Sequence, residues 1–231
     1  MAENLSIKAI NISIDKKTQS TIFKDDVIIK DEIGNIIKSD YAEYDKKNNI
    51  IYLKKNITLN DVDNNILKTN QATYNEILKI FKTDGKTTFE SSNGYSLEGS
   101  VISLNNKNKT IFSNNSTMVK DLDGNTIGLE NFEYISSKKI FKSFGKIEIN
   151  DKKNNTYLFS QLIIDTKNNE MIGTDVKAYL NDEQFKFNKD NKPRIFANTV
   201  QFNDSGTNFQ KSAFTFCNYR DGDKCPPWEF T

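Results

Sequence analysis

The chain has 231 residues, of which 36% are hydrophobic, with 16 Phe, 9 Tyr, 3 Pro and no His, and its formal net charge is +1. This balance is too aromatic for a disordered chain, and it supplies no global field that would recruit nucleic acid or an anionic membrane. The absence of histidine excludes Ser-His-Asp and Cys-His nucleophiles and HExxH zinc sites. No apolar run is as long as about 18 residues, the length that a membrane-spanning helix needs.

One sequence unit of thirty residues is repeated along the chain. Residues 9–26 match the second half of a unit, and full copies follow without a gap from Val27, Ile57, Thr87, Thr117 and Ile147. Self-similarity at a fixed period indicates one supersecondary unit stacked on itself. The many aromatic residues suit strands, so we expect an all-β architecture of stacked repeats.

Two turn sites recur in each unit. The first lies at Gly34-Asn35, Asn64-Asn65, Asn93-Gly94, Gly124-Asn125 and Asn154-Asn155, and the second at Asn48-Asn49, Asn106-Lys107-Asn108, Ser136-Ser137 and Asn168-Asn169. Asn and Gly tolerate the left-handed backbone of tight hairpins, so the strands between the turns are expected to pair antiparallel. Halfway along several of these strands stand Gly85, Gly99, Gly128 and Gly145. These glycines predict bends that carry a strand from one sheet to a facing one.

Apolar residues form columns at the thirty-residue period, with polar residues in the neighbouring columns. The columns are Ile29, Leu59, Phe89, Val119, Ile149 and Tyr179; Ile37, Leu67, Leu97, Ile127 and Tyr157; Ala42, Ala72, Ile102, Phe132 and Leu162; Tyr44, Tyr74, Leu104, Tyr134 and Ile164; and Ile51, Phe81, Ile111, Phe141 and Met171. This alternation predicts an inward apolar face. The face fits either a dry core or an open groove for an apolar ligand, and periodicity does not separate the two.

Few residues suggest chemistry. The segments 61–65 (DVDNN) and 121–125 (DLDGN) resemble fragments of calcium loops, but they fall at the hairpin positions, so turn chemistry explains them. The pairs Lys54-Lys55 and Lys138-Lys139 suit a solvated face, contact with phosphates or protection of a sheet edge from unwanted pairing. No catalytic constellation is found, so we expect a protein that is not an enzyme and needs no cofactor or metal.

The two cysteines, Cys217 and Cys225, flank a turn at Asp221-Gly222 and precede Pro226-Pro227-Trp228. They suit a local disulfide or two bonds to cysteines elsewhere, and either arrangement favours an oxidising compartment. We expect residues 1–212 to form the repeat domain and residues 213–231 to form a linker segment.

The repeat, with its A-x-Y-D/N motif at residues 42–45 and 72–75, resembles the OstA-like periplasmic domain of the lipopolysaccharide-transport proteins LptA, LptC and LptD. The ending FTFCNYRDGDKCPPWEF, residues 214–230, resembles the segment that closes the N-terminal domain of the LptD family and precedes its outer-membrane barrel.

The resemblance implies an open V-shaped β-jellyroll at the periplasmic face of the outer membrane of Gram-negative bacteria. Such a domain carries the acyl chains of lipopolysaccharide toward a barrel. The implied partners are the bridge protein LptA, by edge-strand stacking, and the lipoprotein LptE together with the full barrel. No nucleic acid is expected as a partner. The implied disulfides of Cys217 and Cys225 include bonds to barrel cysteines. The groove-lining residues are then Ile29, Ile37, Tyr44, Ile51, Leu59, Phe81, Phe89, Ile102, Val119, Phe132, Phe141 and Ile149.

Two other classes fit parts of the sequence. A structural or adhesive β-solenoid has a dry core and parallel coils in place of hairpins. A carbohydrate-active module needs clustered carboxylates or an aromatic platform, and the single Trp228 lies outside the repeats.

Overall fold

The computed structural model describes residues 5–181, 193–215 and 228–230. The described residues form antiparallel strands and contain no helix, which confirms the predicted all-β, jellyroll-like fold. In this part of the chain, no helix is therefore long and apolar enough to cross a membrane. The chain divides into two compact units, Met1–Thr117 (unit 1) and Met118–Thr231 (unit 2), and each is described by itself.

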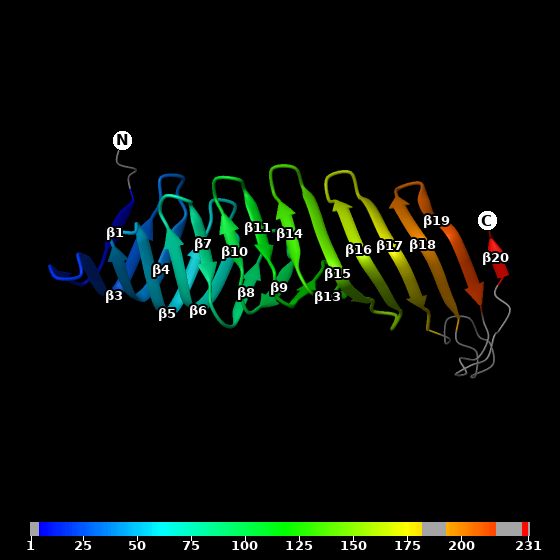
Figure 1. Cartoon of the computed structure of the whole chain (residues 1–231), viewed down its shortest axis with the longest axis horizontal. Coiled ribbons are helices and arrows are strands. Elements are labelled where there is room, and N and C mark those ends of the chain that lie inside the picture. The colour runs from blue at the N-terminus through cyan, green and yellow to red at the C-terminus, as the bar shows by residue number, and fades with distance from the viewer. Residues whose placement is uncertain (1–4, 182–192, 216–227, 231) are drawn as a thin grey trace. The chain divides into compact units, whose positions relative to one another are not determined.

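Unit 1 is a series of hairpins whose strands follow one another along the stack (Figure 1). Its strands are β1 (Ser6–Lys8), β2 (Asn11–Asp15), β3 (Ser20–Lys30), β4 (Ile36–Asp45), β5 (Ile50–Asn60), β6 (Ile66–Asn75), β7 (Ile80–Thr83), β8 (Thr87–Glu90), β9 (Ser96–Gly99), β10 (Ser103–Asn105) and β11 (Thr110–Ser113). The strand β12 (Thr117–Lys120) begins at the boundary. The antiparallel pairing excludes the parallel coils of a solenoid for this unit.

Each long strand of unit 1 belongs to two half-sheets because it changes direction at its middle. The register of β3 shifts between Lys24 and Val27, and that of β5 shifts between Lys54 and Ile57. Half-sheet one contains β2, β7, β10, β11 and residues 20–24, 41–45, 50–54 and 71–75. Half-sheet two contains β1, β8, β9 and residues 27–30, 36–39, 57–60 and 66–69.

The hairpin turns of unit 1 form two rows, one at each end of the strands. Row one is made of residues 15–20, 45–50, 75–80 and 105–110, and row two of residues 31–35, 61–65 and 91–95. Every turn has one residue with left-handed backbone, and these are Gln19, Asn49, Lys79 and Lys109 in row one and Gly34, Asn64 and Gly94 in row two. The predicted turn positions are thus confirmed in this unit.

The core of unit 1 lies between the two half-sheets. Its buried members are Phe23, Val27, Ile29, Ile37, Ala42, Ile51, Leu53, Ile57, Leu59, Leu67, Ala72, Tyr74, Phe81, Phe89, Ile102 and Leu104. All five predicted columns contribute buried members to this cluster, and Tyr44, Leu97 and Ile111 pack against it as partly buried neighbours. Burying one such side chain contributes about 1.5–3 kcal/mol to folding, so this cluster is the main stabilising element of unit 1.

Unit 2 continues the pattern of antiparallel hairpins. Its strands are β13 (Thr126–Leu129), β14 (Phe132–Ile135), β15 (Ile140–Asn150), β16 (Thr156–Asp165), β17 (Glu170–Tyr179), β18 (Arg194–Asn203), β19 (Gly206–Thr215) and β20 (Trp228–Phe230). The register of β15 shifts between Phe144 and Ile147, where Gly145 has a φ of +91°. The buried apolar residues of this unit are Leu129, Phe132, Ile147, Phe159, Leu162, Val176, Ala178, Ala197 and Val200.

The predicted inward position of Tyr179 is wrong. Its side chain is 39% exposed, while the neighbouring Ala178 is buried. The strand β15 holds one extra residue opposite β16 at its bend, whereas β17 pairs with β16 in equal steps on both sides of Asp175. Without the extra residue, the face that points inward moves by one position, and Ala178 takes the place that the repeat assigns to Tyr179.

The predicted bends at glycine are right at three of four positions. Gly85, between β7 and β8, and Gly145 have left-handed backbone at the bend. Gly99 ends β9 in half-sheet two, and the chain resumes at Ser103 in half-sheet one, so the strand changes half-sheet there as predicted. Gly128 lies inside β13 without a break. The equivalent bends in β3 and β5 use non-glycine residues, Asp25-Asp26 and Lys55-Asn56, all with positive φ. Composition did not reveal these bends because Asp, Asn and Lys are common throughout the chain.

Candidate functional site

The predicted groove residues of unit 1 come together in one apolar interior. Seven are buried members of the core, and Tyr44 packs against it partly buried; the seven are Ile29, Ile37, Ile51, Leu59, Phe81, Phe89 and Ile102. They come from both half-sheets, so the interior is continuous along the repeats of this unit.

The predicted groove residues of unit 2 are less completely covered. Phe132 is buried, whereas Val119, Phe141 and Ile149 are half-buried. The rings of Phe132 and Phe141 stack, with centroids 6.1 Å apart and planes 10° from parallel. Ile149 lies opposite Ile127 in the pair of β15 and β13. Apolar surface thus remains partly accessible in these columns.

In unit 1 the interior is filled by its own side chains. Ile51, Phe81 and Ile102 have no exposed surface, and Phe89, the most exposed buried residue of the cluster, is 9% exposed. Because protein interiors are close-packed, an acyl chain enters this space only if the half-sheets move apart. The sequence predicted the residues of the interior but not whether it is closed.

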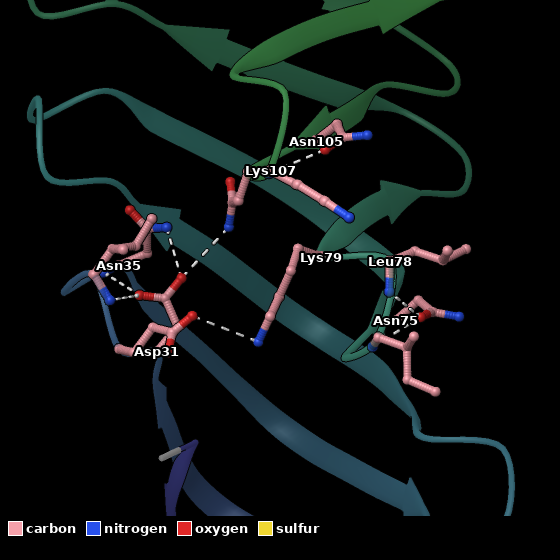
Figure 2. A network of polar contacts seen from close by, with 11 residues as sticks. Asp31, Asn35, Asn75, Leu78, Lys79, Asn105 and Lys107 are labelled. Carbon is pink, nitrogen blue, oxygen red and sulfur yellow. Dashed lines mark hydrogen bonds and ion pairs between the residues drawn. The ribbon is translucent and has the colours of Figure 1, made fainter. Parts of the chain in front are cut away.

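Polar contacts join the two rows of turns on one side of unit 1 (Figure 2). The amide Nδ2 of Asn106, in row one, donates a hydrogen bond to Oδ2 of Asp31, in row two, at 3.4 Å. The Nζ atom of Lys79, in row one, lies 3.8 Å from Oε1 of Glu32, in row two. No sequence pattern pointed to these contacts, because Asp31 and Asn106 are 75 positions apart.

Tyr74 lies near this group of charges, and Tyr44 contacts Glu76 at a turn of row one. Burial raises the pKa of Tyr74 to about 12, while the positive charge of Lys79 acts in the opposite direction. Burial, together with a hydrogen bond to Oε2 of Glu76 at 2.8 Å, raises the pKa of Tyr44 to about 12. Both phenols therefore remain neutral and able to donate hydrogen bonds at physiological pH.

The aspartates of the calcium-like segments serve as turn caps. Oδ1 of Asp61 accepts from the backbone N–H of Asn65 at 2.9 Å, and Oδ2 accepts from its side chain at 2.7 Å. Asp121 and Asn125 make the same pair of contacts. Among the described residues no group of three acidic or cysteine side chains is placed to hold a metal ion. Turn chemistry thus accounts for both segments.

The turns of row two are also linked to one another through asparagine side chains. Oδ1 of Asn35 accepts from the backbone N–H of Val62 at 3.2 Å, and Oδ1 of Asn65 accepts from that of Ser92 at 2.9 Å. Asn35 is only 5% exposed, so its amide needs these partners. The row is therefore held in order by its own side chains.

A polar hollow of about 660 Å³ lies at the bends of β3 and β5. It is lined by Lys24, Asp25, Asp26, Asp40, Tyr41, Lys54 and Lys55. The Nζ atom of Lys54 stands 5.6 Å from the ring centroid of Tyr41. This charged lining suits water or a polar group and does not suit an acyl chain. The predicted cysteine pair, Cys217 and Cys225, lies outside the described residues.

Residues 3–112 match the family model described as "Lipopolysaccharide-assembly, LptC-related". The match covers just under half of the chain and ends within unit 1. A search of curated proteins found no match. The match supports the resemblance to the jellyroll proteins of lipopolysaccharide transport, and it does not single out LptD among them.

Proposed function

We propose that the chain carries lipopolysaccharide without chemical change, with the acyl chains held between the half-sheets. The strongest support is that the residues matching the family model and the residues enclosing the apolar interior lie in the same part of the chain. The residues that match the LptC-related family, 3–112, are those that enclose the apolar interior of unit 1. The proposed lining is the set of predicted groove residues in both units.

The energetics favour a carrier of this kind. Each buried methylene contributes about 0.8 kcal/mol, so one long acyl chain costs on the order of 10 kcal/mol to expose to water. Lipid with several chains therefore needs a continuous apolar surface to cross an aqueous compartment. Within unit 1 the columns of the repeat supply such a surface, and no bond has to be made or broken.

The proposed location is the periplasm, in contact with other proteins of the same transport system. In unit 1, β2 pairs with β3 on one side, and Ile12 and Ile14 are 57% and 72% exposed. An uncovered edge strand with apolar side chains is a ready template for another chain. We therefore propose β2 as the edge at which a bridge protein such as LptA stacks.

A more specific proposal is an LptD-type role, in which lipid passes to an outer-membrane barrel with LptE. Its support is the ending with Cys217, Cys225 and Pro226-Pro227-Trp228. Finding that the parent gene continues past Thr231 into the alternating strands of a barrel would support this role, and finding an unrelated continuation would remove it.

One observation favours a second function. The complete burial of Ile51, Phe81 and Ile102 is what a dry core gives, so a purely structural β-domain is the alternative. In that case the apolar columns stabilise the fold and bind nothing.

Binding of fluorescent lipid A to the unmodified chain tests the proposal. We expect saturable binding that intact lipid A displaces and that its de-acylated, still phosphorylated saccharide does not. Displacement by both compounds would indicate recognition of the headgroup alone. Absence of binding would support the alternative, a purely structural β-domain. Either result contradicts the proposed acyl-chain carrier.

A further inference from the structure

We infer that the contacts of Asp31 with Asn106 and of Glu32 with Lys79 form a clasp that closes one side of unit 1. A lipid chain then enters the interior sideways, by separation of the two turn rows at this clasp. The inference rests on the proposed function and adds the route by which the lipid enters. The rim is the line along which the two turn rows of unit 1 meet. Figure 2 shows Asp31 and Lys79 facing each other across it.

The two rows of unit 1 carry opposite charges. The turns of row one hold seven lysines and three carboxylates, whereas those of row two hold four carboxylates and no lysine. Opposite charges favour closure of the rim, and salt weakens the attraction between exposed groups. The clasp is the place where this attraction becomes direct contact.

The clasp is weak enough to open. The side chain of Glu32 is 48% exposed, and such a pair contributes little against water and salt. The turn that bears Asp31 does not depend on the clasp for its shape. Oδ1 of Asp31 accepts a hydrogen bond from the backbone N–H of Asn35 at 2.8 Å, and Oδ2 of Asp31 accepts one from the side-chain amide of Asn35 at 2.7 Å. Separation of the rows therefore breaks contacts across the rim and leaves the turn intact.

The bends provide a hinge for this movement. Halfway between the two rows, Asp25-Asp26 in β3 and Lys55-Asn56 in β5 are exposed and leave the regular ladder. A bulge is a point where a strand changes direction at little cost to the pairing on either side. Rotation at the bends moves the half-sheets apart at the rim, where the filled interior has to open.

A covalent link across the rim tests the inference. The variant Glu32→Cys/Lys79→Cys, in a Cys217→Ser/Cys225→Ser background, is joined by a short bis-maleimide and mixed with fluorescent lipid A. One control is the same protein capped with a mono-maleimide, which forms no link. The second control is Lys47→Cys/Ile77→Cys, joined by the same reagent within row one, where both side chains are exposed.

We expect the cross-rim link to slow lipid association at least tenfold. The association rates of both controls should be close to that of the unlinked background protein. Equal association rates for the linked and the capped protein would overturn the clasp while leaving the carrier function in place. If the unlinked background protein binds no lipid at all, the proposed function itself fails. Thermal unfolding of each sample verifies that the linked protein is folded.

Discussion

Lys79 and Glu32 stand on opposite turn rows of unit 1, and their charged atoms lie 3.8 Å apart. They belong to different half-sheets, so their contact joins two surfaces that the strands connect only through the bends. The side chain of Lys79 is 17% exposed and that of Glu32 is 48% exposed. The pair therefore sits at the border between the apolar interior and water, where a change in charge alters access to the interior.

Removal of this charge pair is expected to speed lipid entry. We predict that Glu32→Gln raises the association rate of fluorescent lipid A severalfold, because the amide does not attract Lys79 as a carboxylate does. Raising the salt concentration should speed association to the natural protein and have less effect on the variant. Stopped-flow fluorescence measures both rates. Glu98→Gln, which removes the exposed pair with Lys86, serves as the control and should leave the rate unchanged.

The core of unit 1 is expected to be sensitive to loss of volume. Phe81→Ala should lower the free energy of unfolding by about 3–5 kcal/mol, because the ring is fully buried and its removal leaves a cavity. Ile77→Ala, at a row-one turn where the side chain is 66% exposed, should change it by less than about 0.5 kcal/mol. Urea denaturation followed by circular dichroism gives both values. Equal effects at the two positions would contradict the assigned core.

The bend of β5 stores backbone strain that glycine relieves. Lys55 has a φ of +65° and an exposed side chain, so Lys55→Gly should raise the free energy of unfolding by up to about 1 kcal/mol. Lys38→Gly, at an exposed position within β4, should lower it by about 0.5–1 kcal/mol. Opposite signs in denaturant titrations support the bend, and a loss of stability at both positions would contradict it.

The asparagines of row two are expected to differ from those of row one. Asn35→Ala should cost about 1–3 kcal/mol, because it removes, at a buried position, the acceptor of the Val62 backbone N–H and one donor to the carboxylate of Asp31. Asn48→Ala removes a similar contact with Asp45 at an exposed turn and should cost less than about 1 kcal/mol. Thermal or urea unfolding compares the two variants. A larger loss at Asn48 would exclude the proposed ordering of row two.

Alkaline pH should weaken the fold through its buried phenols. Burial raises the pKa of Tyr44 and of Tyr74 from 10.0 to about 12. A raised pKa in the folded state means that the stabilisation is fully present below pH 10.0 and is lost as the pH rises through about 12. The free energy of unfolding should therefore fall across this window, and fall less steeply in Tyr74→Phe. Urea titrations on both sides of the window measure the difference, and identical slopes would contradict the assignment.

Most of the fold follows from the thirty-residue period. Turns and buried columns of unit 1 repeat with it, and the core of unit 1 contains the residues that the period indicates. The prediction failed at Tyr179, where the absence of one bulge residue reverses the inward face, because a bulge has no sequence signature when Asp or Lys occupies it. The rim contacts of Asp31 and Lys79 were also not predicted, because they depend on how sharply the strands bend.

The residues of the candidate site could be predicted from the sequence. Whether the interior that they form is open or closed could not. Phe81 and Phe89 were assigned to the interior from periodicity, and both lie there. Whether they contact lipid depends on the free energy needed to part the half-sheets, which hydrophobic patterning does not contain. Burial of the core residues, the bends and the inferred clasp together determine this free energy.

Photo-crosslinking from the interior tests the carrier function most directly. A benzophenone side chain is placed at Phe81, Phe89, Phe132 or Phe141, and at the outward Lys82 and Lys142 as controls, and each protein is irradiated with lipopolysaccharide. We expect lipid adducts from the four phenylalanine positions and few from the two lysine positions. Adducts only from Lys82 and Lys142 would contradict an interior that carries acyl chains.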